Sequence, residues 1–182
     1  VFNCVNSLLS LDKKINKNLL NTVYPVIPLS HITGLIGFLP NCDTISHLIL
    51  EERKINNKMP NVEIQATYKI CPKYDSTTFL NKVEIFKEVN MITSGYELND
   101  IIWKKSVSCE SWIIRKKNYS NSLSVMSVVG YILGLGDRHP NNITMDRQNG
   151  KIIHIDYGDC FVIAMKRKKF PEKVPFRLTR ML

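Results

Sequence analysis

Residues that can bind a hard cation gather in one stretch, GLGDRHPNNITMDRQNGKIIHIDYGD, which spans residues 134–159. Asp137 and Asn142 stand five positions apart, and Asp156 follows directly after an apolar run. Amide and carboxylate oxygens are ligands that suit Mg²⁺. In phosphoryl transfer, one aspartate orients the attacking hydroxyl while an asparagine and a second aspartate hold metal on the phosphates. The residue types and their spacing therefore favour phosphoryl transfer.

Each of these residues has a simpler structural interpretation when it is taken alone. Asp137 could cap a helix or turn, Asn142 could be a turn residue, and His139 or His154 could be a hydrogen-bonded structural histidine. A zinc hydrolase would explain the two histidines, but they lack the usual ligand spacing and a third partner. It is the combination of D-R-H-x-x-N with a following H-I-D-[aromatic]-G that favours a catalytic site.

The first half of the chain shows short strands and then helices. Residues 1–11 predict the end of an amphipathic helix, and residues 24–30 and 34–40 predict two short buried strands joined by a turn. Asp43 or Thr44 is expected to be the N-cap of a helix that ends in the polar stretch EERKINNKMP. A second helical stretch is predicted to end at CP, the dipeptide that precedes KYDSTT.

The second half predicts more helices and one hairpin. Asp75-Ser76 is expected to cap a helix over residues 77–91, and ELNDIIWKK and SCESWIIRKK predict two shorter helices. YSNSLSVMSVVGYILGL predicts one long, largely buried helix. NITM and KIIHID predict strands joined at the Asn149-Gly150 turn signal, with Asp146 and Asp159 structural in the turn and the loop. The order of elements indicates an α+β chain dominated by helices.

Composition limits the class of protein. A chain of 182 residues with 44% hydrophobic residues can bury the core of one domain or of a large part of one. Its five cysteines contain no CxxC pair, which favours reduced thiols. The apolar run of residues 125–135 is too short to span a bilayer, and the N-terminus does not resemble a signal peptide.

The formal net charge is +9, and much of the excess lies near the end of the chain. Residues 161–182 contain seven Lys or Arg and one Glu. This segment could be a solvated basic loop or a surface that faces phosphate or substrate, and the pattern leaves both open. Because it shows no aromatic interleaving and no nucleic-acid-reading motif, we do not expect a nucleic-acid partner.

The block LGLGDRHPNNITMD…GKIIHIDYGDCF resembles the catalytic core of the phosphatidylinositol 3-kinase-related kinases, whose loop reads D-R-H-x-x-N and whose metal motif is D-F-G. VMSVVGYILGLGDRHP and FPEKVPFRLTRML look like the target-of-rapamycin (TOR) kinases of that superfamily. The resemblance extends upstream through VIPLSHITGLIGFLPNCDT and so covers essentially the whole chain. It implies a serine/threonine protein kinase with a bilobal fold that uses ATP and Mg²⁺.

By this resemblance, Asp137 would be the catalytic base and His139 a group near the γ-phosphate. Asn142 and Asp156 would be the magnesium ligands. The adenine pocket and hinge would be formed by Tyr24, Ile36, Gly37, Phe38, Leu39, Thr144 and Ile155. These assignments of roles come from the family and add to what the spacing alone indicates.

The resemblance also implies an organisation of the chain. Residues 1–40 would be the end of the N-lobe with the hinge, and residues 41–182 the C-lobe. In the C-lobe, residues 56–95 would be the insertion that docks a WD-repeat β-propeller subunit, residues 134–145 the catalytic loop, and Asp156 the start of the substrate-facing activation segment. Protein substrates and scaffold subunits of TOR complexes are the other expected partners. The expected location is the cytoplasm, with nucleus or endomembranes reached through partners and membrane association only indirect.

The chain departs from the TOR pattern at Tyr157, Phe38 and Thr144, where Phe, Trp and Met are usual. These changes are expected to alter the pocket wall more than the chemistry. The basic run KRKK leaves a phosphoinositide lipid kinase as one alternative. A truncated, inactive binding module for the WD-repeat subunit is another. Because the upper clamp on ATP with its lysine is not found in the 182 residues, we expect the isolated chain to be inactive.

Overall fold

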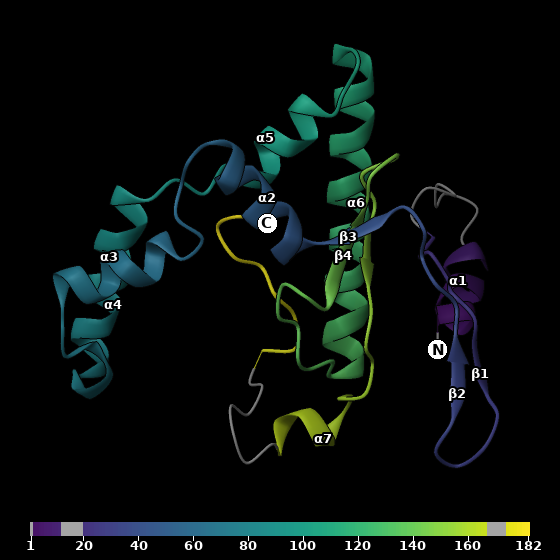
Figure 1. Cartoon of the computed structure of the whole chain (residues 1–182). Helices are drawn as coiled ribbons and strands as arrows, with labels where there is room; N and C mark the ends of the chain where they lie inside the picture. The colour runs from purple at the N-terminus through teal and green to yellow at the C-terminus, as the bar shows by residue number, and fades with distance from the viewer. Residues whose placement is uncertain (1, 12–19, 167–173) are drawn as a thin grey trace.

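The computed structural model describes residues 2–11, 20–166 and 174–182, with the side chains of Ile163 and Met165 left out. Helices dominate, and two small antiparallel sheets lie among them (Figure 1). The expected α+β class is therefore confirmed. None of the helices in these ranges is long and apolar enough to cross a membrane.

The N-terminal part consists of helix α1 (Phe2–Leu11) and a hairpin of β1 (Val26–Pro28) and β2 (Gly34–Ile36). The predicted helix and both strands are confirmed, although the strands are shorter than expected. Their predicted burial is wrong, because every residue of β1 and β2 is exposed. The hairpin stands away from the long helix α6 in Figure 1, and its apolar side chains Val26, Leu35 and Ile36 are exposed.

The second sheet joins β3 (Cys42–Thr44), β4 (Ile143–Asp146) and β5 (Ile152–His154) in the order β3-β4-β5. The predicted hairpin of β4 and β5 is confirmed, and Gly150 turns it with φ of +76°. Strand β3, which the sequence did not predict, pairs Thr44 with Thr144. Thr44 also caps α2 (Ile45–Ile55) by accepting a hydrogen bond from the His47 N–H, so the N-cap is Thr44 rather than Asp43.

Helices α3 (Val62–Ile70) and α4 (Phe79–Ile92) pack together and project from the body as a two-helix arm (Figure 1). A short 3-10 turn, η2 (Tyr74–Ser76), joins them. The predicted cap at Asp75-Ser76 is wrong, since α4 begins after Thr78. Asp75 instead accepts a hydrogen bond from the Tyr68 hydroxyl, and the Ser76 hydroxyl donates to the Lys73 carbonyl within the turn.

The long helix α6 (Cys109–Leu133) follows α5 (Glu97–Lys104). The sequence predicted two helices where α6 is continuous through Asn118-Tyr119-Ser120. The polar side chains there do not break the helix, because the Ser122 and Ser124 hydroxyls donate back to carbonyls four residues earlier. The amide of Asn118 meanwhile donates to the Asn149 carbonyl in the β4–β5 turn. α6 is only partly buried, since Val128, Tyr131 and Ile132 are exposed. Helix α7 (Val162–Met165) follows β5.

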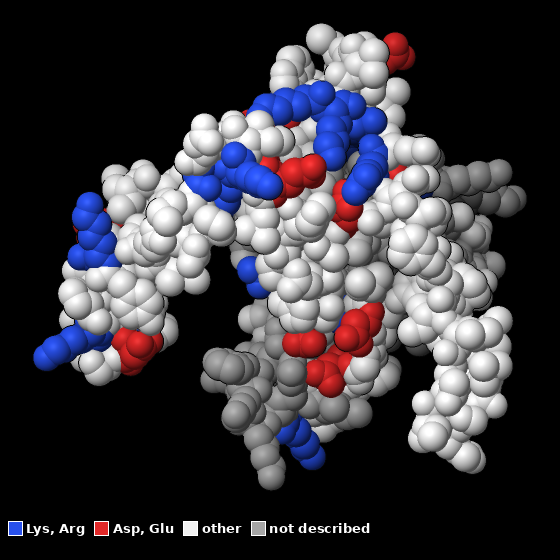
Figure 2. Space-filling view, in the orientation of Figure 1, with Lys and Arg blue, Asp and Glu red and all other residues white. Residues whose placement is uncertain are grey.

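The core lies where α2, α5 and α6 meet the three-stranded sheet. Its buried side chains are Ile45, Leu48, Leu98, Ile101, Ile102, Tyr119, Leu123, Ile143, Met145 and Ile152. Charged side chains lie around it. Lys and Arg gather near α5 and the adjoining part of α6 with some Asp and Glu beside them, and a further acidic group lies lower on the same face (Figure 2). Four of the seven basic residues of segment 161–182 lie outside the described residues.

A buried ion network joins the arm to this core. Arg53 on α2 is 4% exposed and donates to Glu97 on α5 at 3.2 Å and to Glu63 on α3 at 2.9 Å. It also donates to the carbonyl of Pro60. Glu97 itself is only 2% exposed. A buried carboxylate without a cation is costly, so Glu97 needs Arg53 beside it. The bonds of Arg53 to Glu97 and Glu63 thus hold α2, α5 and α3 together.

Replacing Arg53 by methionine should lower the free energy of unfolding by about 3–5 kcal/mol, because Glu97 would stay buried without its cation. The same change at Lys54, the exposed neighbour on α2, should cost less than about 0.5 kcal/mol. Urea denaturation of the two variants and the parent chain measures both values. Equal losses at the two positions would show that the network does not hold the helices together.

Candidate active site

The loop of the D-R-H-x-x-N motif begins where α6 ends in a left-handed residue. Gly134 has φ of +57°, and its N–H donates to the Gly130 and Tyr131 carbonyls. A Cβ at Gly134 would lie 3.2 Å from the Cα of Phe161, and one at Gly136 would lie 2.6 Å from the Cβ of Ala164. The two glycines thus let the segment after β5 lie directly against the loop.

The loop places the predicted base, histidine and asparagine side by side. The amide nitrogen of Asn142 donates to the Asp137 carbonyl at 3.0 Å and to its carboxylate at 3.4 Å. His139 Nε2 lies 3.8 Å from the Asp137 carboxylate, and His139 Nδ1 accepts the Asn141 N–H. Asn142 is buried, while a third of the Asp137 side chain (33%) and 46% of the His139 side chain are exposed. Asp137 and His139 are therefore open to a substrate.

Asp156 is brought to the same loop through the end of β5. The Ile155 N–H donates to the Asn142 carbonyl at 3.0 Å, so the residue before Asp156 is bonded to the catalytic loop. Asp137 and Asp156 both have left-handed backbone, with φ of +59° and +57°. Such a conformation in a residue other than glycine costs about 1–3 kcal/mol and tends to persist at functional sites. Both candidate carboxylates thus stand on strained backbone.

Arg138, between Asp137 and His139 in the chain, holds this strained backbone in place. Its side chain is buried and donates to the carbonyls of Gly136 at 2.8 Å and Ile155 at 2.8 Å. It also donates to the carbonyls of Asn142 at 3.3 Å and of Asp156. Burial lowers the pKa of the guanidinium, which nevertheless stays charged because arginine does not deprotonate in proteins. One cation therefore connects the loop after α6 to the residues that follow β5.

Tyr157 fills the aromatic position of the D-F-G-like motif without an unpaired hydroxyl. Its hydroxyl donates to the His154 carbonyl at 2.7 Å, and burial raises the pKa of the phenol. The ring contacts Phe2 of α1 edge to face at 4.6 Å between centroids. Arg138 lies over the same ring, 5.6 Å from its centroid. The departure from phenylalanine is thus accommodated by one added hydrogen bond.

His154 differs from its simplest interpretation. We expected a hydrogen-bonded structural histidine, but neither ring nitrogen has a hydrogen-bond partner within the described ranges. The side chain is buried in the sheet. Burial, with a smaller contribution from the charge of Arg138, lowers the pKa of the imidazole to about 4, so it is neutral at pH 7. His154 is therefore a buried neutral side chain beside the site.

A cleft of about 720 Å³ lies between the β1–β2 hairpin and the three-stranded sheet. It collects every residue that the resemblance assigned to the adenine pocket, namely Tyr24, Ile36, Gly37, Phe38, Leu39, Thr144 and Ile155. Asp156 also lines it. The volume falls within the range of about 300–1,000 Å³ that is typical of sites for small molecules and cofactors. Segments far apart in sequence thus form one cavity with a carboxylate at its edge.

Local contacts shape the walls of this cleft. The Gly37 N–H donates to the Pro25 carbonyl at 2.7 Å, and a Cβ at Gly37 would lie 2.5 Å from the Pro25 ring. Phe38 is 88% exposed. The Thr144 hydroxyl donates to the Ile153 carbonyl at 2.9 Å, so it is used inside the sheet. Burial raises the pKa of Tyr24 on the opposite side of the cleft.

The residues proposed as metal ligands suit Mg²⁺ by their chemistry. Because the amide nitrogen of Asn142 is engaged with Asp137, the amide oxygen is the atom of this side chain that can accept a cation. Asp156 is exposed at the edge of the cleft and supplies carboxylate oxygens. Magnesium prefers such oxygens and keeps several waters, so a small protein share of ligands is sufficient.

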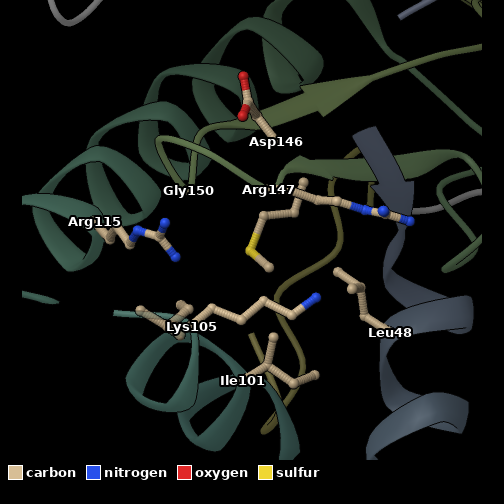
Figure 3. Close-up of a pocket in the computed structure, with 9 residues that line it drawn as sticks. Leu48, Ile101, Lys105, Arg115, Asp146, Arg147 and Gly150 are labelled. Atoms are coloured by element: carbon tan, nitrogen blue, oxygen red, sulfur yellow. The ribbon is translucent and has the colours of Figure 1, made fainter. Parts of the chain in front are cut away.

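A second hollow, beside the β4–β5 turn, is too small for a nucleotide. It holds about 10 Å³, roughly the space of one water molecule. Lys105, which directly follows α5, Arg115 of α6 and Asp146 at the end of β4 line it together with Leu48 and Ile101 (Figure 3). The Asp146 carboxylate accepts the N–H groups of Gln148 and Asn149, which confirms its structural role in the turn. This hollow lies where α2, α5, α6 and β4 meet.

Sequence reasoning missed part of this site. It gave Arg138 no role, although an arginine inside a loop between two apolar runs was a visible signal. It also did not assign Val26, Cys42, Thr44 and Tyr157, which line the cleft. Tyr157 stands next to Asp156, which it did assign, whereas Cys42 and Thr44 belong to β3, which was not predicted at all.

Replacing Arg138 by lysine should loosen the catalytic loop, because one ammonium group cannot reach carbonyls on both sides of it. The amides of Asn142 and Ile155 should exchange with solvent about tenfold faster or more, as expected when a hydrogen bond of a charged group is lost. Arg147→Lys, at an exposed arginine paired with Asp43, serves as the matched control. Unchanged exchange in Arg138→Lys would contradict the role given to Arg138.

The comparisons with known proteins agree with this geometry. The profile of the family described as phosphatidylinositol 3- and 4-kinase matches residues 1–182. The chain is 52% identical to the serine/threonine-protein kinase tor1 of Schizosaccharomyces pombe and 51% identical to the serine/threonine-protein kinase TOR of Arabidopsis thaliana. Each alignment covers 100% of this chain, which spans only 8% and 7% of the length of these two relatives.

Among solved structures, the FAT and kinase domain of CtTel1 superposes with a TM-score of 0.78 and 27% identity. The superposition covers 99% of this chain and 13% of that one. The expected catalytic fold is thereby confirmed. With a profile match over its whole length, the chain belongs to the phosphatidylinositol 3- and 4-kinase family, and within that family it is similar to the TOR serine/threonine kinases.

Proposed function

We propose that this chain supplies the hinge, the catalytic loop and the metal ligands of an ATP- and Mg²⁺-dependent kinase that phosphorylates serine or threonine in proteins. One observation carries the proposal. The cleft between hairpin and sheet unites the assigned pocket residues with Asp156, and Asp156 is tied through Ile155 and Arg138 to the loop that holds Asp137 and Asn142. The similarity to TOR kinases supports protein rather than lipid substrates.

The residues divide the work of phosphoryl transfer. Residues 36–39 and Ile155 provide apolar and backbone surfaces on which an adenine ring fits. Asp137, partly exposed, accepts the proton of the attacking hydroxyl, and Asn142 orients it by donating to its carboxylate. His139, 3.8 Å from that carboxylate, faces the transferred group. When bound at Asn142 and Asp156, Mg²⁺ would neutralise negative charge on the phosphates.

The wider organisation of the protein is part of the same proposal. The lobes are divided near residue 40, the segment from Asp156 onward faces the protein substrate, and residues 56–95 dock a WD-repeat subunit of a TOR-type complex. Helices α3 and α4 support the last point, because the arm projects from the body and exposes Ile64, Phe79 and Phe86. We also propose a cytoplasmic location, which the resemblance to TOR kinases implies.

Replacing Asp137 by asparagine in the full-length protein should lower the rate of protein phosphorylation by about 10²- to 10⁴-fold, because the proton acceptor is lost. Nucleotide affinity should change little, since Asp137 does not line the cleft. Asp146→Asn is the control, because the amide oxygen can still accept the turn N–H groups. Phosphate transfer and nucleotide binding are measured separately. An active Asp137→Asn enzyme would contradict the proposal.

Replacing Asp156 by asparagine should raise the Mg²⁺ concentration for half-maximal activity by at least about tenfold, since affinity for a hard cation falls with ligand charge. A titration with Mg²⁺ at fixed, saturating nucleotide gives this concentration. Asp146→Asn should leave it unchanged. The same magnesium dependence in the Asp156→Asn and parent enzymes would remove Asp156 from the metal site.

A further inference from the structure

Arg180 holds one end of a segment that reaches across the molecule. Its guanidinium donates to the carbonyls of Asn90 at 2.7 Å and Thr93 at 2.8 Å. It also donates to the Thr93 hydroxyl at 3.0 Å and to the Ser94 carbonyl at 3.4 Å. The carboxylate of Glu63 lies 3.8 Å away. Arg180 therefore contacts both helices of the arm at the point where the arm joins the body.

These acceptors suit a cation for a physical reason. The last carbonyls of a helix have no partner within it and carry the negative end of the helix dipole. Helix α4 ends at Ile92, so the carbonyls of Asn90 and Thr93 belong to this end. A guanidinium placed there makes charge-assisted hydrogen bonds, which are stronger than bonds between neutral groups. Arg180 thus acts as a C-terminal cap supplied from 87 residues away.

A glycine keeps the space that Arg180 needs. A Cβ at Gly95 would lie 2.7 Å from the Nε of Arg180 and 2.9 Å from its Cγ. The backbone of Gly95 is not left-handed, because its φ is not among the positive values of the chain. A glycine is therefore needed at position 95 to leave space for the Arg180 side chain, and not for backbone freedom. Replacing Gly95 is thus a second, independent way to disturb the contact.

Other parts of segment 174–182 contact α6 and the core, while Val174 and Leu178 are exposed. A Cβ at Gly130 of α6 would come within 2.9 Å of the Pro175 carbonyl, so the segment crosses that helix closely. Met181 and Leu182 pack against the hydrophobic core, and the Tyr119 hydroxyl donates to the Leu182 carbonyl at 3.3 Å. The segment is thus seated on α6 and the core, and Arg180 ties it to the arm.

We propose that Arg180 is a positioning residue, which fixes segment 174–182 against the base of the α3–α4 arm and so sets the surface that receives the protein substrate. The proposal rests on the proposed function, in which the segment after Asp156 faces that substrate. Arg180 itself is tied to carbonyls and so does not bind the substrate. Arg180 would affect the reaction only by fixing the course of segment 174–182.

The experiment uses the full-length protein with Arg180→Met, Arg180→Lys and Gly95→Ala. Lys87→Met, at an exposed lysine of α4, is the control. The first readout is amide hydrogen exchange in residues 174–182, which needs no activity. We expect about tenfold faster exchange in Arg180→Met, because hydrogen bonds to a charged group are lost. Gly95→Ala should act in the same direction, and Arg180→Lys should lie between Arg180→Met and the parent.

The second readout is the KM for myelin basic protein, a general kinase substrate, compared with the KM for ATP. Arg180→Met and Gly95→Ala should raise the KM for myelin basic protein by about threefold or more. The KM for ATP should stay within about twofold of the parent value, since only the segment moves. Arg180→Lys should recover part of the loss. A merely structural role would shift both constants or neither.

Three outcomes would count against the inference. Unchanged exchange in segment 174–182 would show that Arg180 does not hold it. Faster exchange with an unchanged KM for the protein would show that the segment does not set the substrate surface. If Arg180→Met fails to accumulate, Gly95→Ala and Arg180→Lys decide by the same criteria. A parent enzyme that phosphorylates no protein would instead contradict the proposed function, and the positioning role would fall with it.

Discussion

The site depends on a single buried cation. The positive charge of Arg138 is buried, and its guanidinium donates hydrogen bonds to four backbone carbonyls instead of to a carboxylate. Because those carbonyls belong to the catalytic loop and to the end of β5, neither segment can move without leaving the guanidinium partly unsatisfied. The left-handed backbone at Asp137 and Asp156 is held by the same contacts. The arginine thus stabilises a strained arrangement that the loop alone would not keep.

Three other constraints shape the surroundings of this centre. Glycines at 134 and 136 allow the segment after β5 to lie against the loop, and the phenol of Tyr157 anchors the turn that follows Asp156. On the far side of the cleft, the contact of Gly37 with Pro25 continues the pairing of the hairpin by one residue beyond β1 and β2. The cleft therefore lies between the three-stranded sheet with its bonded loop and a hairpin whose strand residues are all exposed.

Local signals predicted much of this arrangement. The Asn149-Gly150 turn, the Thr44 cap and the motif spacing of Asp137 with Asn142 all depend on nearby residues, which a sequence displays directly. The gathering of pocket residues in one cleft was anticipated through the family and not through physics, because those residues lie more than a hundred positions apart.

The failures have physical causes that a sequence does not show. The run of Asn and Ser in α6 suggested a break, but their side chains bond to helix carbonyls or to the neighbouring turn. The strands β1 and β2 are apolar and yet exposed, since apolar composition does not tell what covers a strand. Arg138 bonds to carbonyls up to 18 residues away, and Arg180 caps α4 from 87 residues away. Such contacts form only when the chain folds, so the local sequence does not display them.

A structure of the full-length protein with a non-hydrolysable ATP analogue and Mg²⁺ would test the central claim most directly. The account predicts the adenine against residues 36–39 and Ile155, with metal bound by the Asn142 amide oxygen and the Asp156 carboxylate. It also predicts that Arg138 keeps its contacts with the carbonyls of the catalytic loop. A nucleotide bound outside this cleft, or a metal held by other residues, would contradict it.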